Sequence, residues 1–290
     1  MNDKKYRAIF FDWDGTAVTS RKASAEKVTG LMKRLLERDV LLIIISGTCY
    51  ENIAGGRLHE MLPPDCLDNL YLGLDRGARN YRFKKGRPAV FHENMPSGED
   101  KLKIDRAAFA LHEQLYRCYS YQTDIVFSRA NYCKIDMQVE LDRSDKLYFE
   151  AGELKQVEQL LCRHQFSGGL AGVLSLAEEL GRAQGFDAKA TTDAKYIELG
   201  TTTKSDNVDV ILDEVVLPRG IAVSDCAFFG DEFTYMAPGI AGSDAFMITD
   251  KSRKADFFDV SIEPILLPEG VTALGGSVEM FAAFLKAQAQ

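Results

Sequence analysis

Two short apolar runs separated by one helical segment constrain the fold of this chain more than any other feature. Residues 8–11 and 40–45 are continuous β-prone hydrophobic runs, as expected for strands buried on both faces of a parallel sheet. Between them, apolar side chains recur at helical spacing over 24–37, and Ser24 is a suitable N-cap residue. Strand, helix and strand joined by short connections form a βαβ unit, which predicts a doubly wound parallel α/β sheet.

The middle of the chain has a different pattern from the parts on either side of it. Residues 80 to about 145 alternate apolar and polar side chains, which is typical of an antiparallel sheet with one exposed face. A chain of 290 residues is also long enough for two domains. We therefore predict a Rossmann-like core formed by residues 1–83 and 195–290, with an inserted α+β cap domain at 84–194. After residue 194 we expect strands at 195–199, 222–229 and 244–248, and helices at 206–216 and 277–287.

Charge and composition exclude several classes of partner. The formal net charge of −8 argues against nucleic acid or an anionic membrane surface. The longest aliphatic runs are far too short to span a bilayer, and the N-terminal residues lack the apolar segment of a signal peptide. The six cysteines include no CxxC pair, which favours reduced thiols. We expect a cytoplasmic protein that binds a small molecule, and the sequence leaves the oligomeric state open.

Four short polar segments mark the expected site, and three of them directly follow a predicted parallel strand. Ligands of open α/β sheets bind beyond the carboxyl ends of the strands, so these segments are expected to converge. Each segment taken alone is also compatible with an ordinary turn or a solvated surface residue. The segments are Asp12-Trp13-Asp14-Gly15-Thr16, Ser46-Gly47-Thr48, Lys204 before a helix, and Gly230-Asp231-Glu232.

Two aspartates at positions i and i+2 place two carboxylates at one edge of the sheet. Of Asp12 and Asp14, one can attack an electrophile covalently while the other delivers and removes protons. The Ser46 hydroxyl and the backbone N–H groups that follow it, beginning with Gly47, can hold phosphate oxygens. Lys204 would supply positive charge against the nucleophile and a phosphoryl group.

A divalent cation is expected at the same edge. Asp231 and Glu232 offer carboxylate oxygens, and Mg²⁺ prefers a few carboxylates together with water and substrate oxygens. A carboxylate that attacks an anionic phosphate faces like-charge repulsion, which a cation and a lysine would relieve. The pattern therefore predicts Mg²⁺ as cofactor and phosphoryl transfer as the chemistry.

These segments resemble the signatures of a known family. Residues 12–16 resemble DxDGT, the first signature of the haloacid-dehalogenase-like phosphatase superfamily. Ser46, Lys204 and the pair Gly230-Asp231 are similar to its second, third and fourth signatures, in the same order along the chain. The resemblance covers the predicted core, roughly 1–83 and 195–290.

The resemblance implies a role for each matching residue. Asp12 would be the nucleophile, and Asp14 the general acid and base. Ser46 would bind phosphate, and Lys204 would orient and neutralise the reacting groups. Asp12, the backbone carbonyl of Asp14, and Asp231 would be ligands of Mg²⁺.

The segment between the second and third signatures resembles the α/β cap of the Cof-type subgroup, which includes sugar-phosphate phosphatases and phosphomannomutases. Cof-type members usually carry GDxxND at the fourth signature, whereas residues 230–235 here read GDEFTY. We expect Glu232 to supply the missing acid, as in the acidic doublet of other superfamily members. At residues 76–78 an arginine replaces the asparagine of a turn found in relatives, which leaves the substrate undefined.

The expected function is Mg²⁺-dependent hydrolysis of the phosphomonoester of a small metabolite, such as a sugar phosphate, through an aspartyl-phosphate. A mobile cap would close over the site and exclude bulk water. Two alternatives stay open. One is a phosphomutase with the same nucleophile, and the other is a non-catalytic protein that binds a phosphorylated ligand.

Overall fold

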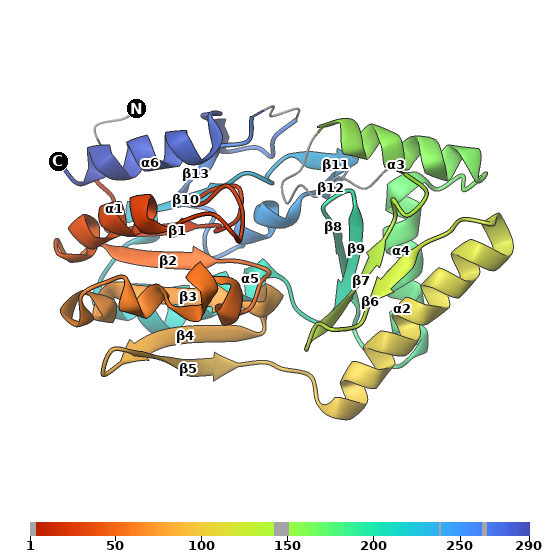
Figure 1. Cartoon of the computed structure of the whole chain (residues 1–290), viewed down its shortest axis with the longest axis horizontal. Coiled ribbons are helices and arrows are strands. Elements are labelled where there is room, and N and C mark those ends of the chain that lie inside the picture. Colours follow the sequence, from red (N-terminus) through yellow and green to blue (C-terminus); the bar gives the residue numbers. More distant parts are fainter. Residues whose placement is uncertain (1–3, 142–150, 238, 263–265) are drawn as a thin grey trace. The chain divides into compact units, whose positions relative to one another are not determined.

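The computed structural model describes residues 4–141, 151–237, 239–262 and 266–290, which form two compact units (Figure 1). The first unit contains Met1–Asn94, Thr203–Thr234 and Asp244–Gln290, and the second contains Met95–Thr202 and Tyr235–Ser243. Among the described residues, no helix combines the length and the apolar character needed to cross a membrane.

The first unit is built on an eight-stranded sheet that is mostly parallel, as predicted for a doubly wound core. Its strand order is β14-β13-β10-β1-β2-β3-β4-β5, and every neighbouring pair from β14 to β3 is parallel. Only β4 and β5, at one edge, pair antiparallel. The strands are β1 (Ala8–Phe11), β2 (Leu41–Ile45), β3 (Leu70–Leu74), β4 (Arg79–Lys84), β5 (Arg87–Glu93), β10 (Cys226–Gly230), β13 (Asp256–Asp259) and β14 (Val271–Ala273).

Alternate side chains of the central strands enter two different hydrophobic clusters. On β1, Ile9 and Phe11 belong to one cluster with α1 (Glu26–Leu36) and α6 (Ser277–Gln288). Phe10 belongs to the other, with α5 (Lys204–Ile211), and stacks on Phe228 at 4.3 Å between ring centroids. All residues of β1, β2 and β10 are buried, and burying each large apolar side chain contributes about 1.5–3 kcal/mol. Covering both faces explains why these strands read as unbroken apolar runs.

The second unit is an α+β structure with its own core. Its four-stranded antiparallel sheet has the order β6-β7-β9-β8, and its helices pack on one face through a separate hydrophobic cluster. A two-stranded hairpin, β11–β12, belongs to the same unit. The elements are β6 (Asp124–Val126), β7 (Tyr132–Asp136), β8 (Lys189–Thr192), β9 (Tyr196–Gly200), β11 (Tyr235–Ala237), β12 (Ile240–Ala241), α2 (Gly98–Tyr119), α3 (Ala151–Arg163) and α4 (Gly169–Ala183).

The structure differs from the sequence predictions at several boundaries. The large sheet continues through β4 and β5 to Glu93, beyond the predicted core limit at 83, while β9 pairs with β7 and β8 in the second unit. The helix predicted from residue 24 begins at Glu26 with Ala25 as N-cap, and the Ser24 hydroxyl, one residue earlier, accepts from the Glu26 N–H at 3.3 Å. The predicted strand at 244–248 is wrong, because Ser243–Met247 forms a 3₁₀ turn.

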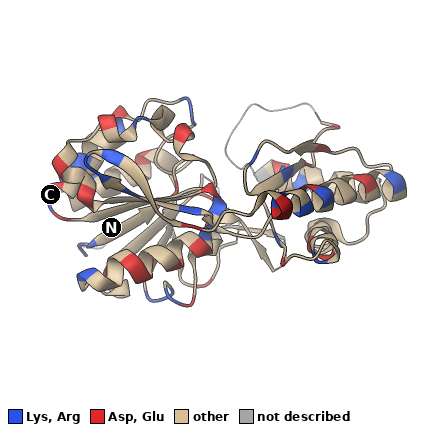
Figure 2. Cartoon of the chain, turned by 90° about the horizontal axis from the view of Figure 1, so that it is seen from below, with Lys and Arg blue, Asp and Glu red and all other residues tan. Residues whose placement is uncertain are grey.

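Figure 2 shows acidic and basic residues interspersed along the helices of each unit, while the strands of the large sheet are mostly uncharged.

Short helical turns fill the remaining connections of the first unit, and α5 continues into a π-helical turn. The short turns are Tyr50–Asn52, Ala54–Gly56, Leu58–Glu60, Pro64–Asn69, Asp75–Gly77, Leu212–Val216 (the π turn), Leu217–Arg219, Val223–Asp225 and Ser243–Met247.

Candidate active site

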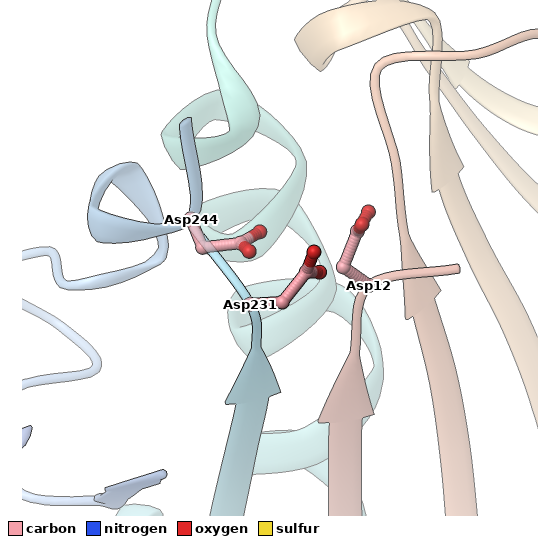
Figure 3. A group of neighbouring side chains, drawn as sticks. All are labelled: Asp12, Asp231 and Asp244. Carbon is pink, nitrogen blue, oxygen red and sulfur yellow. The ribbon is translucent and has the colours of Figure 1, made fainter. Parts of the chain in front are cut away.

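Three buried carboxylates converge at the carboxyl ends of two neighbouring strands of the first unit. Asp12 follows β1 and Asp231 follows β10, and these strands pair in parallel with Phe11 opposite Phe229. Asp244, from the 3₁₀ turn Ser243–Met247, completes the group. One oxygen from each of the three carboxylates lies within 4.8 Å of the others, and Figure 3 shows the side chains pointing toward one another. Their exposed fractions are 7%, 8% and 0%.

Lys204 is the positive charge of this group. It is the first residue of α5, and its Nζ lies 3.1 Å from Oδ1 of Asp12 and 2.6 Å from Oδ1 of Asp244. The start of α5 is fixed by a capping box, in which the Thr203 side chain accepts from the backbone and Asp206 accepts from the Thr203 N–H. The cap therefore fixes the backbone from which the lysine reaches the carboxylates.

Burial and like charge perturb the proton affinities of the group. Burial raises the pKa of Asp12 to about 7, with Lys204 opposing the rise and Asp244 and Asp14 adding to it. The pKa of Asp231 is raised well above its usual value by burial, and further by the neighbouring carboxylates. Burial acts to lower the pKa of Lys204, but Asp12 and Asp244 outweigh it and raise that pKa well above the usual value. Three carboxylates facing one lysine thus leave an excess of negative charge.

The donor set fits a hard divalent cation. Carboxylate oxygens are the ligands that Mg²⁺ takes from proteins, and a cation would offset both the burial and the like charge that raise the pKa values of Asp12 and Asp231. Glycines leave room for the carboxylates. A Cβ on Gly15 would lie 2.0 Å from Oδ2 of Asp231, and one on Gly230 would lie 2.3 Å from Oδ2 of Asp244.

Hydrogen bonds fix the orientation of two of these carboxylates. Thr16 donates its hydroxyl to Oδ1 of Asp231 at 2.8 Å, and both groups are buried. The backbone N–H of Glu232 donates to Oδ2 of Asp244 at 2.8 Å, and the N–H of Asp244 donates back to the Glu232 carbonyl at 3.2 Å. The carboxylates are therefore held in place by the chain itself.

Asp14 lies beside this group, in the tight turn that follows β1. Gly15 takes a φ of +86° there, and its N–H donates to the carbonyl of Val18 at 2.8 Å. Oδ2 of Asp14 accepts from Nε of Arg21 at 3.0 Å, whereas buried Oδ1 has no hydrogen-bond partner among the described residues. One oxygen of Asp14 is thus oriented by an arginine, and the other is available for a further partner.

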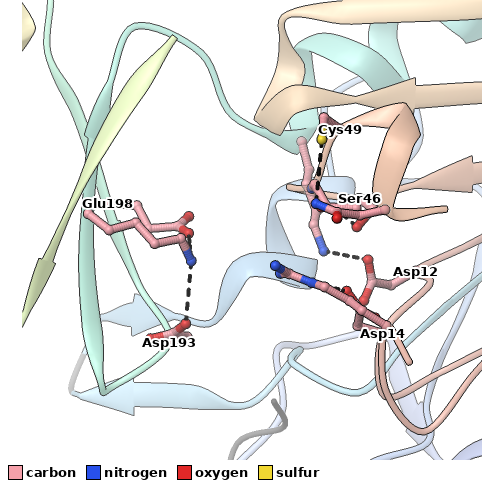
Figure 4. Close-up of polar contacts among 11 residues, drawn as sticks. Asp12, Asp14, Ser46, Cys49, Asp193 and Glu198 are labelled. Carbon is pink, nitrogen blue, oxygen red and sulfur yellow. Dashed lines mark hydrogen bonds and ion pairs between the residues drawn. The ribbon is translucent and has the colours of Figure 1, made fainter. Parts of the chain in front are cut away.

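Ser46 and Gly47 follow β2 at the same edge of the sheet. Since β1 and β2 pair in parallel with Phe11 opposite Ile44, Ser46 comes near Asp12, as Figure 4 shows. Ser46 is buried, and its backbone N–H donates to the carbonyl of Gly73 at 2.9 Å. No heavy atom lies within 4 Å of a Cβ placed on Gly47, so its backbone borders open space.

The structure thus brings Asp12, Asp231 and Lys204 together. The carboxylate of Glu232 is not in the group of three, although its charge raises the pKa values of Asp231 and Lys204. Asp244 is the third carboxylate of the group, and the sequence analysis did not single it out. The only local indication in the sequence was that Asp244 follows Gly242 and Ser243. A Gly-Ser-Asp triplet of this kind is common in ordinary turns and does not by itself predict a site.

No protein-family model matches this sequence, and no curated protein is significantly similar to it. Solved structures do share its fold. An IMP-bound mutant of IMP-nucleotidase from Plasmodium falciparum is 10% identical, with a TM-score of 0.62 over 99% of this chain and 67% of that chain. A trehalose-6-phosphate phosphatase related protein is 16% identical, with a TM-score of 0.51 over 97% of this chain and 96% of that chain.

A haloacid dehalogenase-like hydrolase from Bacteroides thetaiotaomicron is also 16% identical, with a TM-score of 0.50 over 97% of this chain and 99% of that chain. Sequence identities this low establish a common fold alone. The Cof-type assignment stays a prediction. By its architecture, this chain has the fold of the haloacid-dehalogenase-like hydrolases, the superfamily that its four sequence signatures resemble.

Proposed function

We propose that this chain is a Mg²⁺-dependent phosphomonoester hydrolase that uses Asp12 as a covalent nucleophile. The single observation that carries the proposal is the placement of buried Lys204 against Asp12 and Asp244, at 3.1 and 2.6 Å, beside Asp231. A purely structural ion pair needs one carboxylate for one lysine. The additional buried negative charge costs stability unless a cation binds it, so it supports a functional site.

The first step transfers the phosphoryl group to the protein. An oxygen of Asp12 attacks phosphorus as the bond from phosphorus to the leaving oxygen breaks, and Asp14 gives its proton to that oxygen. Lys204 holds Oδ1 of Asp12 and compensates the developing negative charge. The Ser46 hydroxyl and the Gly47 N–H bind phosphate oxygens.

The second step returns the nucleophile to its initial state. Asp14, now a carboxylate, takes a proton from water while the water oxygen attacks phosphorus. The bond between phosphorus and Asp12 breaks, which releases inorganic phosphate and leaves Asp14 protonated again. Arg21 keeps Asp14 oriented in both steps through its 3.0 Å hydrogen bond.

Asp12, Asp231 and Asp244 would hold the metal, together with the backbone carbonyl of Asp14 that the family resemblance implies. When bound, Mg²⁺ supplies positive charge that lets an anionic carboxylate approach an anionic phosphate. Glu232 was expected as a ligand, and we propose Asp244 in its place. Glu232 then contributes its backbone N–H to Asp244 and its charge to the surroundings.

The proposed substrate is a small phosphorylated metabolite, either a sugar phosphate or a nucleoside monophosphate. Two similar structures are named a trehalose-6-phosphate phosphatase related protein and an IMP-nucleotidase, which supports this range of substrates. The role of the second unit as a substrate-selecting cap remains a prediction, as does a cytoplasmic location.

A phosphate-release screen over sugar phosphates, nucleoside monophosphates and a generic aryl phosphate, with Mg²⁺ or with chelator, tests the proposal. Wild-type protein should release phosphate only with the metal, and Asp12→Asn should release none. Asp225→Asn, at a half-buried position before β10, is a matched control that should keep wild-type activity. Transfer of phosphate to a second hydroxyl without release would favour the mutase, and metal and phosphate binding without turnover would favour a binding protein.

A further inference from the structure

The segment between Asp231 and Asp244 leaves the first unit and returns to it. Residues up to Thr234 belong to the first unit, Tyr235–Ser243 belong to the second, and Asp244 begins the first unit again. The chain therefore crosses between the units four times, whereas a simple insertion would require two crossings. Two of the candidate metal ligands flank the additional excursion.

Both ends of this excursion are fixed in the first unit. Phe233 is fully buried in the cluster on the α5 face of the large sheet, and the Thr234 hydroxyl is 3.2 Å from the carbonyl of Leu266. Glu232 and Asp244, where the excursion leaves and re-enters the first unit, are joined by reciprocal hydrogen bonds, and we call this pair the base of the excursion. Because Asp244 is also paired with Lys204, the base of the excursion is part of the candidate active site.

The excursion packs in the second unit. Its described residues, 235–237 and 239–243, which we call the crossing hairpin, include β11 and β12. Met236 is 0% exposed and belongs to the hydrophobic cluster of the second unit, and Ile240 packs against the same cluster. An isolated two-stranded hairpin is at best marginally stable in water, so this packing must supply the order of the hairpin.

We propose that Met236 is a positioning residue for the metal site. Seated in the core of the second unit, it holds the crossing hairpin in one conformation, and the hairpin in turn fixes the Glu232–Asp244 base. Metal occupancy and the packing of the second unit are then thermodynamically linked, and the linkage is reciprocal. The part of this inference that concerns Mg²⁺ affinity rests on the proposed function, whereas the mechanical link between Met236 and the base does not.

The test compares two methionines of the same hydrophobic cluster. Met236 and Met137 are both 0% exposed in the core of the second unit, but only Met236 lies on the crossing hairpin. Met236→Ala and Met137→Ala remove the same side-chain atoms from the same cluster and so create comparable cavities. Met236→Leu nearly conserves volume and should behave as wild type. Ile240→Ala is a milder second hairpin variant if Met236→Ala folds poorly.

Two readouts on the full chain are needed. In metal-free protein, hydrogen exchange at the Glu232 amide should accelerate about tenfold in Met236→Ala and stay unchanged in Met137→Ala. By titration calorimetry, the Mg²⁺ dissociation constant should rise about fivefold in Met236→Ala only. By reciprocity, Mg²⁺ should slow amide exchange in the crossing hairpin of the wild type.

Equal Glu232 exchange rates in the two alanine variants would overturn the inference, as would equal Mg²⁺ affinities in a wild type that binds the metal. If the wild type binds no Mg²⁺, the proposed function fails. Faster exchange in Met236→Ala alone would then still establish the link between the hairpin and the Glu232–Asp244 base. If Met236→Leu exchanges its Glu232 amide at the wild-type rate, the faster exchange in Met236→Ala is due to the lost packing of this side chain.

Discussion

Replacing Gly15 by alanine tests how closely the first motif approaches the metal carboxylates. The new Cβ would lie 2.0 Å from Oδ2 and 2.5 Å from Cγ of Asp231. An ordinary van der Waals contact is about 3.5 Å, so the two groups must separate by about 1.5 Å. That displacement would break the 2.8 Å hydrogen bond from Thr16 to Asp231 and move a carboxylate out of the group of three.

The expected loss of unfolding free energy has two contributions, backbone strain and steric overlap, and a comparison with Gly270 separates them. At a φ of +86°, a non-glycine residue costs about 1–2 kcal/mol, and overpacking at a buried position adds about 1–3 kcal/mol. Gly270 has a φ of +85° in the same unit, but no heavy atom lies within 4 Å of its Cβ position. Gly270→Ala should therefore lose about 1–2 kcal/mol of unfolding free energy, and Gly15→Ala about 2–5 kcal/mol.

Urea denaturation of metal-free protein gives the two free energies of unfolding, and titration calorimetry gives the Mg²⁺ affinities. We expect Gly15→Ala to bind Mg²⁺ at least about tenfold more weakly than the wild type, because one ligand is displaced. Gly270→Ala should bind it as the wild type does. Equal stability losses in the two variants, or unchanged Mg²⁺ affinity in Gly15→Ala, would refute the argument from close approach.

Four further substitutions have defined outcomes. Asp244→Asn should weaken Mg²⁺ binding about 10- to 100-fold, whereas Glu232→Gln should change it less than about threefold. Titration calorimetry measures both affinities. A larger loss in Glu232→Gln than in Asp244→Asn would show that Glu232, and not Asp244, is the metal ligand. Lys204→Met leaves buried carboxylates without their cation, so urea denaturation should show a loss of about 3–5 kcal/mol that Mg²⁺ partly restores. Arg21→Gln should lower kcat about tenfold with little change in Mg²⁺ affinity, and steady-state kinetics that show only a KM effect would contradict its orienting role.

The sequence predicted the parts of the fold whose signals are local. Strands β1, β2 and β10 are buried on both faces, so each appears as an apolar run ending at a polar segment, and the polar residues at their carboxyl ends lie at one edge of the sheet as expected. The edge strand β5 was assigned to the inserted domain, because the alternating pattern that begins near residue 80 was taken to mark that domain. Alternation specifies which face of a strand is buried, but it does not specify which strand is the partner.

Asp244 could not be predicted for a different reason. Its contact with Asp231 and Lys204 depends on a nine-residue excursion whose return point no local pattern specifies. Glu232 was expected because it is adjacent to Asp231, and in the structure its backbone N–H donates to Asp244. Adjacency in sequence gives no indication that Asp244 returns to the same group of carboxylates.

The parallel pairing of β1 with β10 also bears on when, during synthesis, the group of three carboxylates can first assemble and bind the proposed ion. Phe11 and Phe229 lie opposite each other in the sheet although most of the chain separates them in sequence. During synthesis, Asp12 leaves the ribosome among the first residues, but Asp231 and Asp244 emerge only after residues 95–202 of the second unit have been made. Contacts of such long sequence separation form late and slowly. Metal binding should thus require that two segments far apart in sequence have paired, and chains truncated before β10 should bind no metal at this site.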